Sequence, residues 1–233
     1  MTGSFCTYKR VFPQIEKIKA EGARVIPIMS EISSAADTRF GTAAENILRL
    51  KAITGENVIK TISEAEPIGR KKLLDVLIVA PCTGNTIAMI AGGIAASKVT
   101  LAVKSHLRNR RPVVIAVSTN DGLGGNAKNI GILASRKNIY IVPFGQDDCI
   151  EKENSLVSDI KMIIPTADLA LDGRQMQPIL INYRQKSNTV WAWRVWTHTF
   201  GIAFLCKIFG DGWTYSRLNS SFGFRLNSLT YER

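Results

Sequence analysis

DVLIVAPCTGNT, residues 75–86, is the stretch that decides the fold of this chain. After Asp75 it runs through five apolar residues, a pattern typical of a strand buried on both faces of a parallel sheet. It then places Thr, Gly and Asn residues where that strand would end, and such side chains favour the start of a helix. The stretch therefore predicts a strand, a polar turn and a helix in succession.

The same pattern recurs on both sides of this stretch. Strands are predicted at Arg24–Met29, Asp75–Ala80, Pro112–Ser118 and Ile139–Phe144, with a further short one possible at Val58–Thr61. Helical spacing is found between them, at Tyr8–Glu21, Thr42–Thr54, Asn85–Ala95, Lys98–Asn109, Asn126–Lys137 and Ser155–Leu171. Strands that alternate with helices of this length predict a three-layer α/β fold, a Rossmann-like doubly wound parallel sheet.

Both ends of the chain depart from that pattern. Only Met1 precedes the turn Thr2-Gly3-Ser4, so the sheet is expected to lack its first strand, either because the chain begins late or because its sheet has no such strand. All four Trp residues fall in residues 184–233 without sustained periodicity. We expect a domain at 1–183 and an unrelated, irregular, poorly ordered C-terminal tail at 184–233. That tail is either a non-native translation or an amphipathic appendage.

Composition and charge favour a cytoplasmic protein that binds neither nucleic acid nor membrane. The tail holds seven Lys/Arg and two Asp/Glu, so it carries +5 of the net charge of +11 and leaves +6 for residues 1–183. The body has no Trp among its scattered basic residues, which argues against base stacking. Four separated cysteines and two histidines show no metal-ligand spacing. No metal site and no membrane span are expected.

Three polar turns are expected at one edge of the sheet, and two of them follow predicted strands. They are Thr2-Gly3-Ser4, then Thr83-Gly84-Asn85-Thr86, and then Ser118-Thr119-Asn120 with the residues up to Gly124. Ser30, just beyond the strand that ends at Met29, would join them. Because ligands bind at the carboxyl ends of parallel strands, these hydroxyls predict a site for a phosphate-bearing ligand. Tight turns and helix caps explain each segment separately.

The segment APCTGNT, residues 80–86, resembles the cofactor-binding segment of the flavoprotein family that includes phosphopantothenoylcysteine decarboxylase. That resemblance implies FMN. The chain is more closely similar to the family of dipicolinate synthase B subunits, through TGSFCTY, DTRFG, EAEPIG, RPVVIAVSTNDGLG, KNIYIVPFGQDD and QMQPILI, in order from residue 2 to about residue 181.

This second resemblance implies a function and partners. It implies one component of an oxidoreductase, which acts with the nicotinamide-dinucleotide-binding A subunit of dipicolinate synthase, and so with NAD(P), to oxidise dihydrodipicolinate to dipicolinate. It also implies a small dicarboxylate substrate, a homo-oligomer, and the mother cell of a sporulating bacterium. An FMN-dependent decarboxylase or transferase of the same fold, or a non-catalytic partner protein, stays open as an alternative.

The resemblance also implies roles for individual residues. Those implied to surround the cofactor are Gly3, Ser4, Ser30, Thr83, Gly84, Asn85, Thr86, Ser118, Thr119 and Asn120. The catalytic residues are unknown, with Asn120 and Arg39 as candidates. Arg39 belongs, with Asp37 and Gln146-Asp147-Asp148, to segments typical of this family. It would pair with a substrate carboxylate or form a surface salt bridge.

Two residues whose chemistry suggests catalysis, Cys82 and His106, are expected to have no catalytic role. Cys82 lies in the proposed cofactor turn but has no His or acid at a motif-like spacing, so we expect a small packing residue. His106 lies in a predicted helix far from the turns and is expected to be solvated or packed. The absence of a histidine near the turns disfavours decarboxylation of a peptidyl cysteine.

Overall fold

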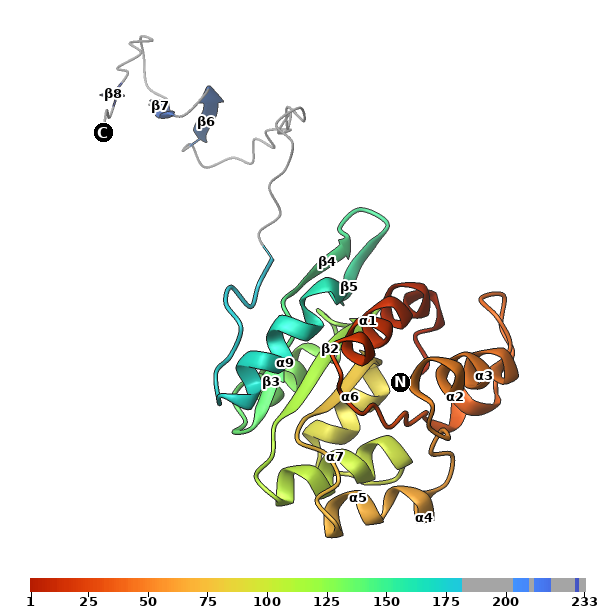
Figure 1. The fold of residues 1–233 in the computed structure, drawn as a ribbon. Coiled ribbons are helices and arrows are strands. Elements are labelled where there is room, and N and C mark those ends of the chain that lie inside the picture. The colour runs from red at the N-terminus through yellow and green to blue at the C-terminus, as the bar shows by residue number, and fades with distance from the viewer. Residues whose placement is uncertain (182–202, 210–211, 219–228, 231–233) are drawn as a thin grey trace. The chain divides into compact units, whose positions relative to one another are not determined.

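The computed structural model describes residues 1–181, 203–209, 212–218 and 229–230. The chain divides into two compact units, Met1–Tyr183 and Arg184–Arg233, and the ribbon of the first is the α/β domain in Figure 1. In the second unit β6 (Ala203–Phe209), β7 (Gly212–Leu218) and β8 (Leu229–Thr230) form an antiparallel sheet in that order. The rest of the expected tail lies outside the described residues.

The domain is built on a mixed sheet. β1 (Leu77–Cys82), β2 (Val113–Thr119) and β3 (Ile139–Ile141) are parallel, with β2 in the middle. β5 (Lys152–Ser158) pairs antiparallel with the carboxyl end of β2, and β4 (Phe144–Asp148) pairs antiparallel with β5. The Rossmann-like α/β class is thus confirmed, with an antiparallel extension that the sequence did not predict.

Helices cover both faces of the sheet, as a doubly wound fold requires. One core joins alternate residues of β1 and β2 to α6 (Gly84–Ala91), α7 (Lys98–Arg108) and α8 (Ala127–Ala134). The other core joins the opposite face to α1 (Tyr8–Ala20) and α9 (Ile163–Leu171). Because β2 is apolar on both faces, Val113 to Val117 are at most 1% exposed.

The remaining helices are short or lie beside the sheet. They are η1 (Phe5–Thr7), α2 (Glu31–Ala35), α3 (Ala43–Thr54), α4 (Ile62–Ala65), α5 (Pro67–Arg70) and η2 (Ile160–Met162). α3 begins where the Thr42 side chain accepts from the Glu45 amide and the Glu45 carboxylate accepts from the Thr42 amide, a complete capping box. It ends at Gly55, whose φ of 74° favours glycine.

Several sequence predictions differ from the structure. The strand predicted at Ile139–Phe144 ends at Ile141, and Phe144 begins β4. Residues 24–29 are extended without forming a ladder, because only Ile28 pairs with Ile59 through an isolated parallel bridge. The predicted strand at 58–61 is reduced to that same bridge. The helix predicted from Ser155 begins only at Ile163, because Ser155 lies in β5 and Leu156–Ser158 pair with β4 and β2 instead.

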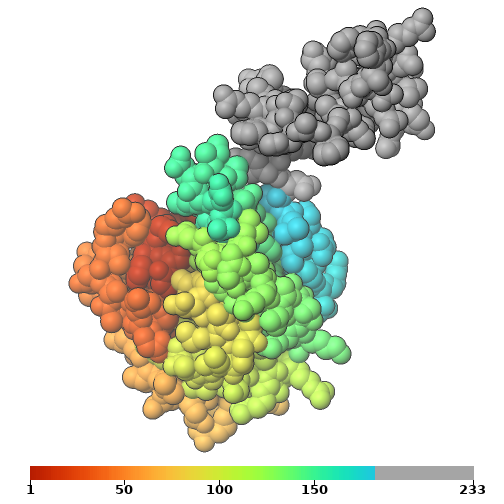
Figure 2. Space-filling model, turned by 180° about the vertical axis from the view of Figure 1, so that it is seen from behind, coloured from red at the N-terminus to blue at the C-terminus, as the bar shows by residue number. Residues whose placement is uncertain are grey.

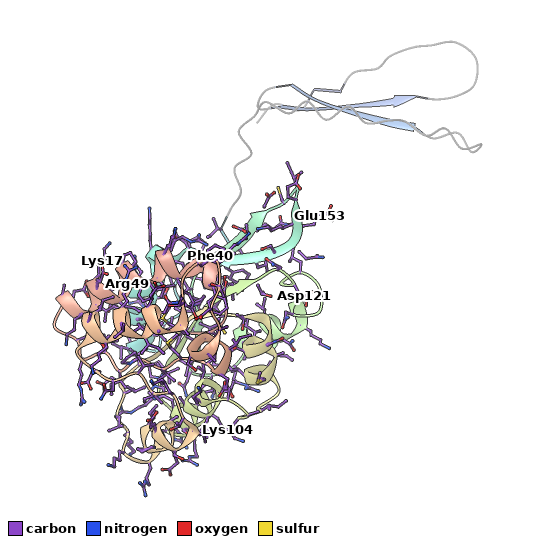
Figure 3. All side chains as sticks on the ribbon, turned by 90° about the vertical axis from the view of Figure 1, so that its right-hand side faces the viewer. Lys17, Phe40, Arg49, Lys104, Asp121 and Glu153 are labelled. Carbon is purple, nitrogen blue, oxygen red and sulfur yellow. The ribbon has the colours of Figure 1, made fainter. Side chains whose placement is uncertain are left out.

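The missed strand and its partner form a hairpin. Figure 1 shows β4 and β5 extending beyond the parallel part of the sheet. In Figure 3 Glu153 lies on this hairpin, at the end of the domain opposite Lys104. No helix in the described part of the chain is long and apolar enough to cross a membrane.

Candidate functional site

The first turn of the chain is tied to the turn after β1. The Thr2 hydroxyl donates to the Pro81 carbonyl at 2.8 Å and accepts from the Thr83 amide at 3.0 Å. Thr2 is 1% exposed, so both bonds are shielded from water. The two turns, about eighty positions apart in the sequence, therefore form one surface at the carboxyl end of β1.

The same turn is tied to the end of β2 by a cluster of three hydroxyls. Ser4 Oγ lies 2.8 Å from Ser118 Oγ, which in turn lies 2.9 Å from Thr7 Oγ1. Ser4 and Thr7 are themselves 3.1 Å apart. Ser118 and Thr7 are buried, and Ser4 is partly exposed. The cluster places the predicted residues Ser4 and Ser118 in direct contact.

The N-terminus of α6 lacks a side-chain cap, as do those of α1, α8 and α9. Its N-cap residue, Thr83, makes no side-chain capping bond, whereas Ser30, Thr42 and Ser97 cap α2, α3 and α7. Uncapped first-turn amides at a helix N-terminus are donors for an anion. The Thr83 and Thr86 hydroxyls are 3.2 Å apart beside them.

Gly84 makes close contact between the second and third turns. A Cβ at this position would lie 2.6 Å from Asn126 Nδ2 and 2.7 Å from Thr119 Oγ1. A side chain fits there only if Asn126 and Thr119 move. Gly3 is similarly confined, since its Cβ would lie 2.9 Å from Ile32 Cγ2.

Ser30 joins this edge through the backbone. Its amide donates to the Met1 carbonyl at 3.0 Å, and its hydroxyl lies 2.8 Å from Ser33 Oγ. Figure 2 shows the N-terminal segment, in red, between the orange segment that follows it and the yellow to green segments. Ser30 therefore lies next to the Thr2-Gly3-Ser4 turn, as the sequence predicts.

The third turn is held by its own side chains and by the hairpin. Asp121 accepts from the Gly125 amide at 2.9 Å and from Asn126 Nδ2 at 3.2 Å. Asn120 Oδ1 accepts from the Ser155 hydroxyl at 3.4 Å. Figure 3 shows Asp121 and the hairpin residue Glu153 on the same side of the domain. The β4–β5 hairpin thus borders the edge that carries the three turns.

Arg39 lies on an exposed turn before α3 and has no hydrogen bond or salt bridge to this edge among the described residues. Its guanidinium lies 4.8 Å from the centre of the Phe40 ring. Asp37 accepts from the Ala43 amide at 2.9 Å and so fixes the start of α3. Gln146 Nε2 donates to the Glu153 carbonyl across the hairpin. Asp37 and Gln146 therefore stabilise local turns.

Cys82 and His106 are both packing residues. Cys82 is fully buried, and burial raises the pKa of its thiol to about 12, so the nucleophilic thiolate is absent near neutral pH. His106 is 1% exposed on α7, and burial lowers the pKa of its imidazole despite a hydrogen bond to the Pro112 backbone. Its Nε2 has no partner in the described part of the chain.

Sequence reasoning missed two hydroxyls at this edge, Thr2 and Thr7, as separate site residues. Thr2 forms more hydrogen bonds between the first two turns than Ser4 does. Thr7 follows Ser4 by three positions, which is one helical turn, and this spacing would have placed both hydroxyls on one face. The described residues contain no cluster of His, Cys, Asp and Glu that could hold a metal ion.

Comparison with known proteins identifies the family. A model described as "Flavoprotein" matches residues 1–168. The B subunit of the dipicolinate synthase of Bacillus subtilis is 45% identical over 185 residues, which are 79% of this chain and 92% of that protein. A crystal structure of the B subunit of dipicolinate synthase from Bacillus halodurans is 43% identical, with a TM-score of 0.71 over 77% of this chain and 92% of that one.

More distant solved structures share the fold. An FMN-dependent cysteine decarboxylase, SpaF, is 22% identical, with a TM-score of 0.53 over 73% of this chain and 93% of that one. This likeness supports the flavoprotein architecture and says nothing of the reaction. Together with the 45% identity over most of its length, the family match shows that the chain belongs to the flavoprotein family of dipicolinate synthase B subunits.

Proposed function

We propose that this chain is the flavin-binding B subunit of a dipicolinate synthase. It acts with the nicotinamide-dinucleotide-binding A subunit, which supplies NAD(P), to oxidise dihydrodipicolinate to dipicolinate in the mother cell of a sporulating bacterium. The observation that carries the proposal is the joined polar edge. Thr2 bonds the turn after β1 at 3.0 Å, and Ser4 bonds the end of β2 at 2.8 Å.

The edge fits the phosphate and ribityl groups of FMN. Backbone amides at the uncapped N-terminus of α6 suit a phosphate, and the surrounding groups are neutral hydroxyls. A side chain at position 84 would displace Asn126 and Thr119, as expected where backbone packs closely against a ligand-binding turn. In this proposal the phosphate and ribityl chain are held by Gly3, Ser4, Ser30, Thr83, Asn85 and Thr86.

The third turn is proposed to face the ring of the flavin and the substrate. Thr119 and Asn120 present a hydroxyl and an amide there, and Ser155 on the hairpin fixes Asn120 Oδ1 at 3.4 Å. That bond turns the Asn120 amide hydrogens away from Ser155 and leaves them free to donate. A bound flavin would supply an electron-accepting ring at this point.

The proposed reaction needs little acid–base help from the protein. Oxidation of the dihydropyridine ring removes a hydride equivalent and a proton, and the product ring is aromatic. The oxidised nicotinamide held by the partner is the proposed final acceptor. The chain's own residues would then orient the dicarboxylate and exclude water. Arg39 would take part only if the turn before α3 closes over a bound substrate.

Flavin binding is the test of the cofactor assignment. The full chain is titrated into FMN, and quenching of the flavin fluorescence is followed. We expect saturable binding with a stoichiometry of one per chain. Riboflavin, which lacks the phosphate, should bind at least tenfold more weakly. Equal affinity for riboflavin and FMN would refute the placement of the phosphate at α6.

Activity with the partner protein tests the reaction. The FMN-loaded chain is mixed with the A subunit of the Bacillus subtilis synthase, dihydrodipicolinate and oxidised nicotinamide dinucleotide, and the absorbance of dipicolinate is followed. A colourless protein that still activates the partner would instead support a non-catalytic role. Bleaching of the flavin on addition of a peptidyl cysteine would support a decarboxylase. Size measurement tests the proposed homo-oligomer.

A further inference from the structure

Lys98 is a buried cation at the start of α7. Its side chain is 5% exposed, whereas the other cations in ion pairs among the described residues are 30–71% exposed. Lysines are rarely buried this far, because removing an ammonium from water is costly unless partners compensate it. As the first residue of α7, Lys98 also places a positive charge at the positive end of the helix macrodipole. Two general preferences are therefore broken at one residue, as happens at functional sites.

The Lys98 ammonium has two partners, and both belong to α2. Its Nζ donates to Ser34 Oγ at 3.2 Å and lies 4.0 Å from Glu31 Oε1. The exposed Glu31 carboxylate also accepts from the Lys98 backbone amide at 3.2 Å. In the part of the chain that the structure describes, the ammonium makes no hydrogen bond outside α2. One side-chain bond and one backbone bond thus tie α2 to the first turn of α7.

Ser34 extends this contact to Ser30. The Ser34 hydroxyl, which accepts from Lys98, donates to the Ser30 carbonyl at 3.0 Å, and the Ser34 amide donates to the same carbonyl at 3.0 Å. A Cβ on Gly3 would lie 2.9 Å from Ile32 Cγ2, so α2 also packs against the first polar turn. A single hydroxyl therefore connects Lys98 to a residue of the proposed cofactor site.

α2 needs an anchor of this kind because it is short. Its five residues make little more than one helical turn, and a helix of that length has no stability of its own. Its position is therefore set by the groups that it contacts. α7 is a firm support, since Val99 and Ala102, which follow Lys98 on it, are at most 3% exposed in the core.

We propose that Lys98 is a positioning residue for the cofactor edge. Its buried ammonium holds α2 against α7 through Ser34 and so keeps the Ser30 hydroxyl at the place proposed for the phosphate and ribityl chain of FMN. The inference rests on the proposed function, because the placement of Ser30 matters to a ligand only if this edge binds one. Lys98 contacts α2 and acts on the ligand through it.

Removal of the ammonium tests this role. Lys98→Met keeps most of the side-chain stem, and we expect it to lower FMN affinity at least fivefold in a fluorescence titration. Lys98→Arg keeps a cation that can donate to Ser34, and it should recover at least half of that loss. Lys104→Met, the same change at an exposed position on α7 (Figure 3), should leave the affinity unchanged. Unchanged affinity in Lys98→Met, or no recovery in Lys98→Arg, would overturn the proposal.

A double-mutant cycle tests whether Lys98 acts through Ser34. Ser34→Ala should lower FMN affinity at least threefold. Because the two side chains act in series, Lys98→Met combined with Ser34→Ala should lose no more than Lys98→Met alone. Losses that add independently would contradict the route through Ser34.

Hydrogen exchange without flavin tests the contact separately from the cofactor. The Ser34 amide should exchange at least fivefold faster in Lys98→Met than in the parent chain. The Asn46 amide of α3, which bonds the Thr42 carbonyl at 3.2 Å, should not change. A parent chain that binds no FMN would refute the proposed cofactor, and the exchange rates would still decide whether Lys98 holds α2. Equal exchange of the Ser34 amide in the two chains would overturn the inference.

Discussion

The two sides of β1 differ in how much they contribute to the fold. On one side Leu77, Ile78 and Val79 pair in register with β2, and the joined core is closed by three helices. On the other side residues 24–28 are extended but meet β1 only across an apolar groove. The first sixty residues are therefore held by α1, by Met1, by hydroxyl bonds at the polar edge, and by contacts of Ile28, Ile59 and α2 with the core and with α7. The difference teaches that site formation and core stability rest on separate parts of this domain.

A pair of identical substitutions should show the largest difference between the two sides. Ile115 on β2 is 0% exposed, so Ile115→Ala should lower the free energy of unfolding by about 2–5 kcal/mol through lost contacts and a cavity. Ile26 lines the groove and is only partly buried, so Ile26→Ala should cost less than about 1 kcal/mol. Urea unfolding followed by circular dichroism measures both.

The comparison would fail if the two substitutions had equal cost. An Ile26→Ala loss as large as that of Ile115→Ala would mean that residues 24–28 are packed as tightly as β2. The urea midpoint should shift without a change in slope, since both variants keep the same folded surface.

A substitution at Gly84 tests the carboxyl end of β1, where the polar turns meet. In Gly84→Ala the new methyl would lie 2.6 Å from Asn126 Nδ2 and push the third turn away. We expect FMN affinity to fall at least tenfold, because the turns on both sides of the proposed phosphate shift. Fluorescence titration measures the loss.

Gly131→Ala is the matched control. Gly131 lies inside α8 with no atom within 4 Å of the added Cβ, so the substitution should leave FMN affinity unchanged. It should also stabilise the helix by about 0.5–1 kcal/mol. Unchanged FMN affinity in Gly84→Ala would show that the turn containing Gly84 is not part of the cofactor site.

The sequence predicted most of the paired side of β1 and little of the open side. Continuous apolar runs located β1, β2 and β3 because strands buried on both faces need them. The run Arg24–Met29 has the same apolar pattern, yet pairing needs a neighbour in space, and the groove provides none there. Hydrophobic periodicity indicates that a segment is buried, but it does not indicate which strand lies beside that segment.

The meeting of the polar turns at one edge was predicted better than the elements beside them. Polar turns after apolar strands placed Ser30, Thr83 and Ser118 at one edge, because parallel strands bring their carboxyl ends together. The hairpin was missed because Ser155 to Ser158 combine hydroxyls with apolar residues and suit a helix start equally well. Arg39 was proposed from family resemblance alone, and its guanidinium contacts the neighbouring Phe40 ring instead of the edge.

Ser118 connects the two sides, so its loss should have an intermediate effect. Ser118→Ala removes the hydrogen-bond partner of both Ser4 and Thr7 and leaves the buried Thr7 hydroxyl with fewer partners. We expect a loss of about 1–2 kcal/mol in unfolding free energy. Ser135→Ala, at an exposed hydroxyl that bonds the Ile132 carbonyl, should change stability by less than about 0.5 kcal/mol. Equal losses would show that the hydroxyl cluster does not join the N-terminal turn to β2.

The smallest expected effect is a dependence of the unfolding free energy on pH. It arises at the amino ends of β1 and β2. Burial lowers the pKa of His106 in the folded chain below its ordinary value of 6.5, so the folded state keeps the imidazole neutral while the unfolded state takes up a proton. Because the unfolded state binds more protons, stability is fully present above pH 6.5 and falls as the pH drops below it. Urea midpoints at about pH 7.5 and about pH 5.5 should therefore differ more in the parent chain than in His106→Asn, whose side chain does not titrate. An equal pH response would assign the loss to other groups. It would also mean that His106, with its unpartnered Nε2, does not contribute to the loss of stability at low pH.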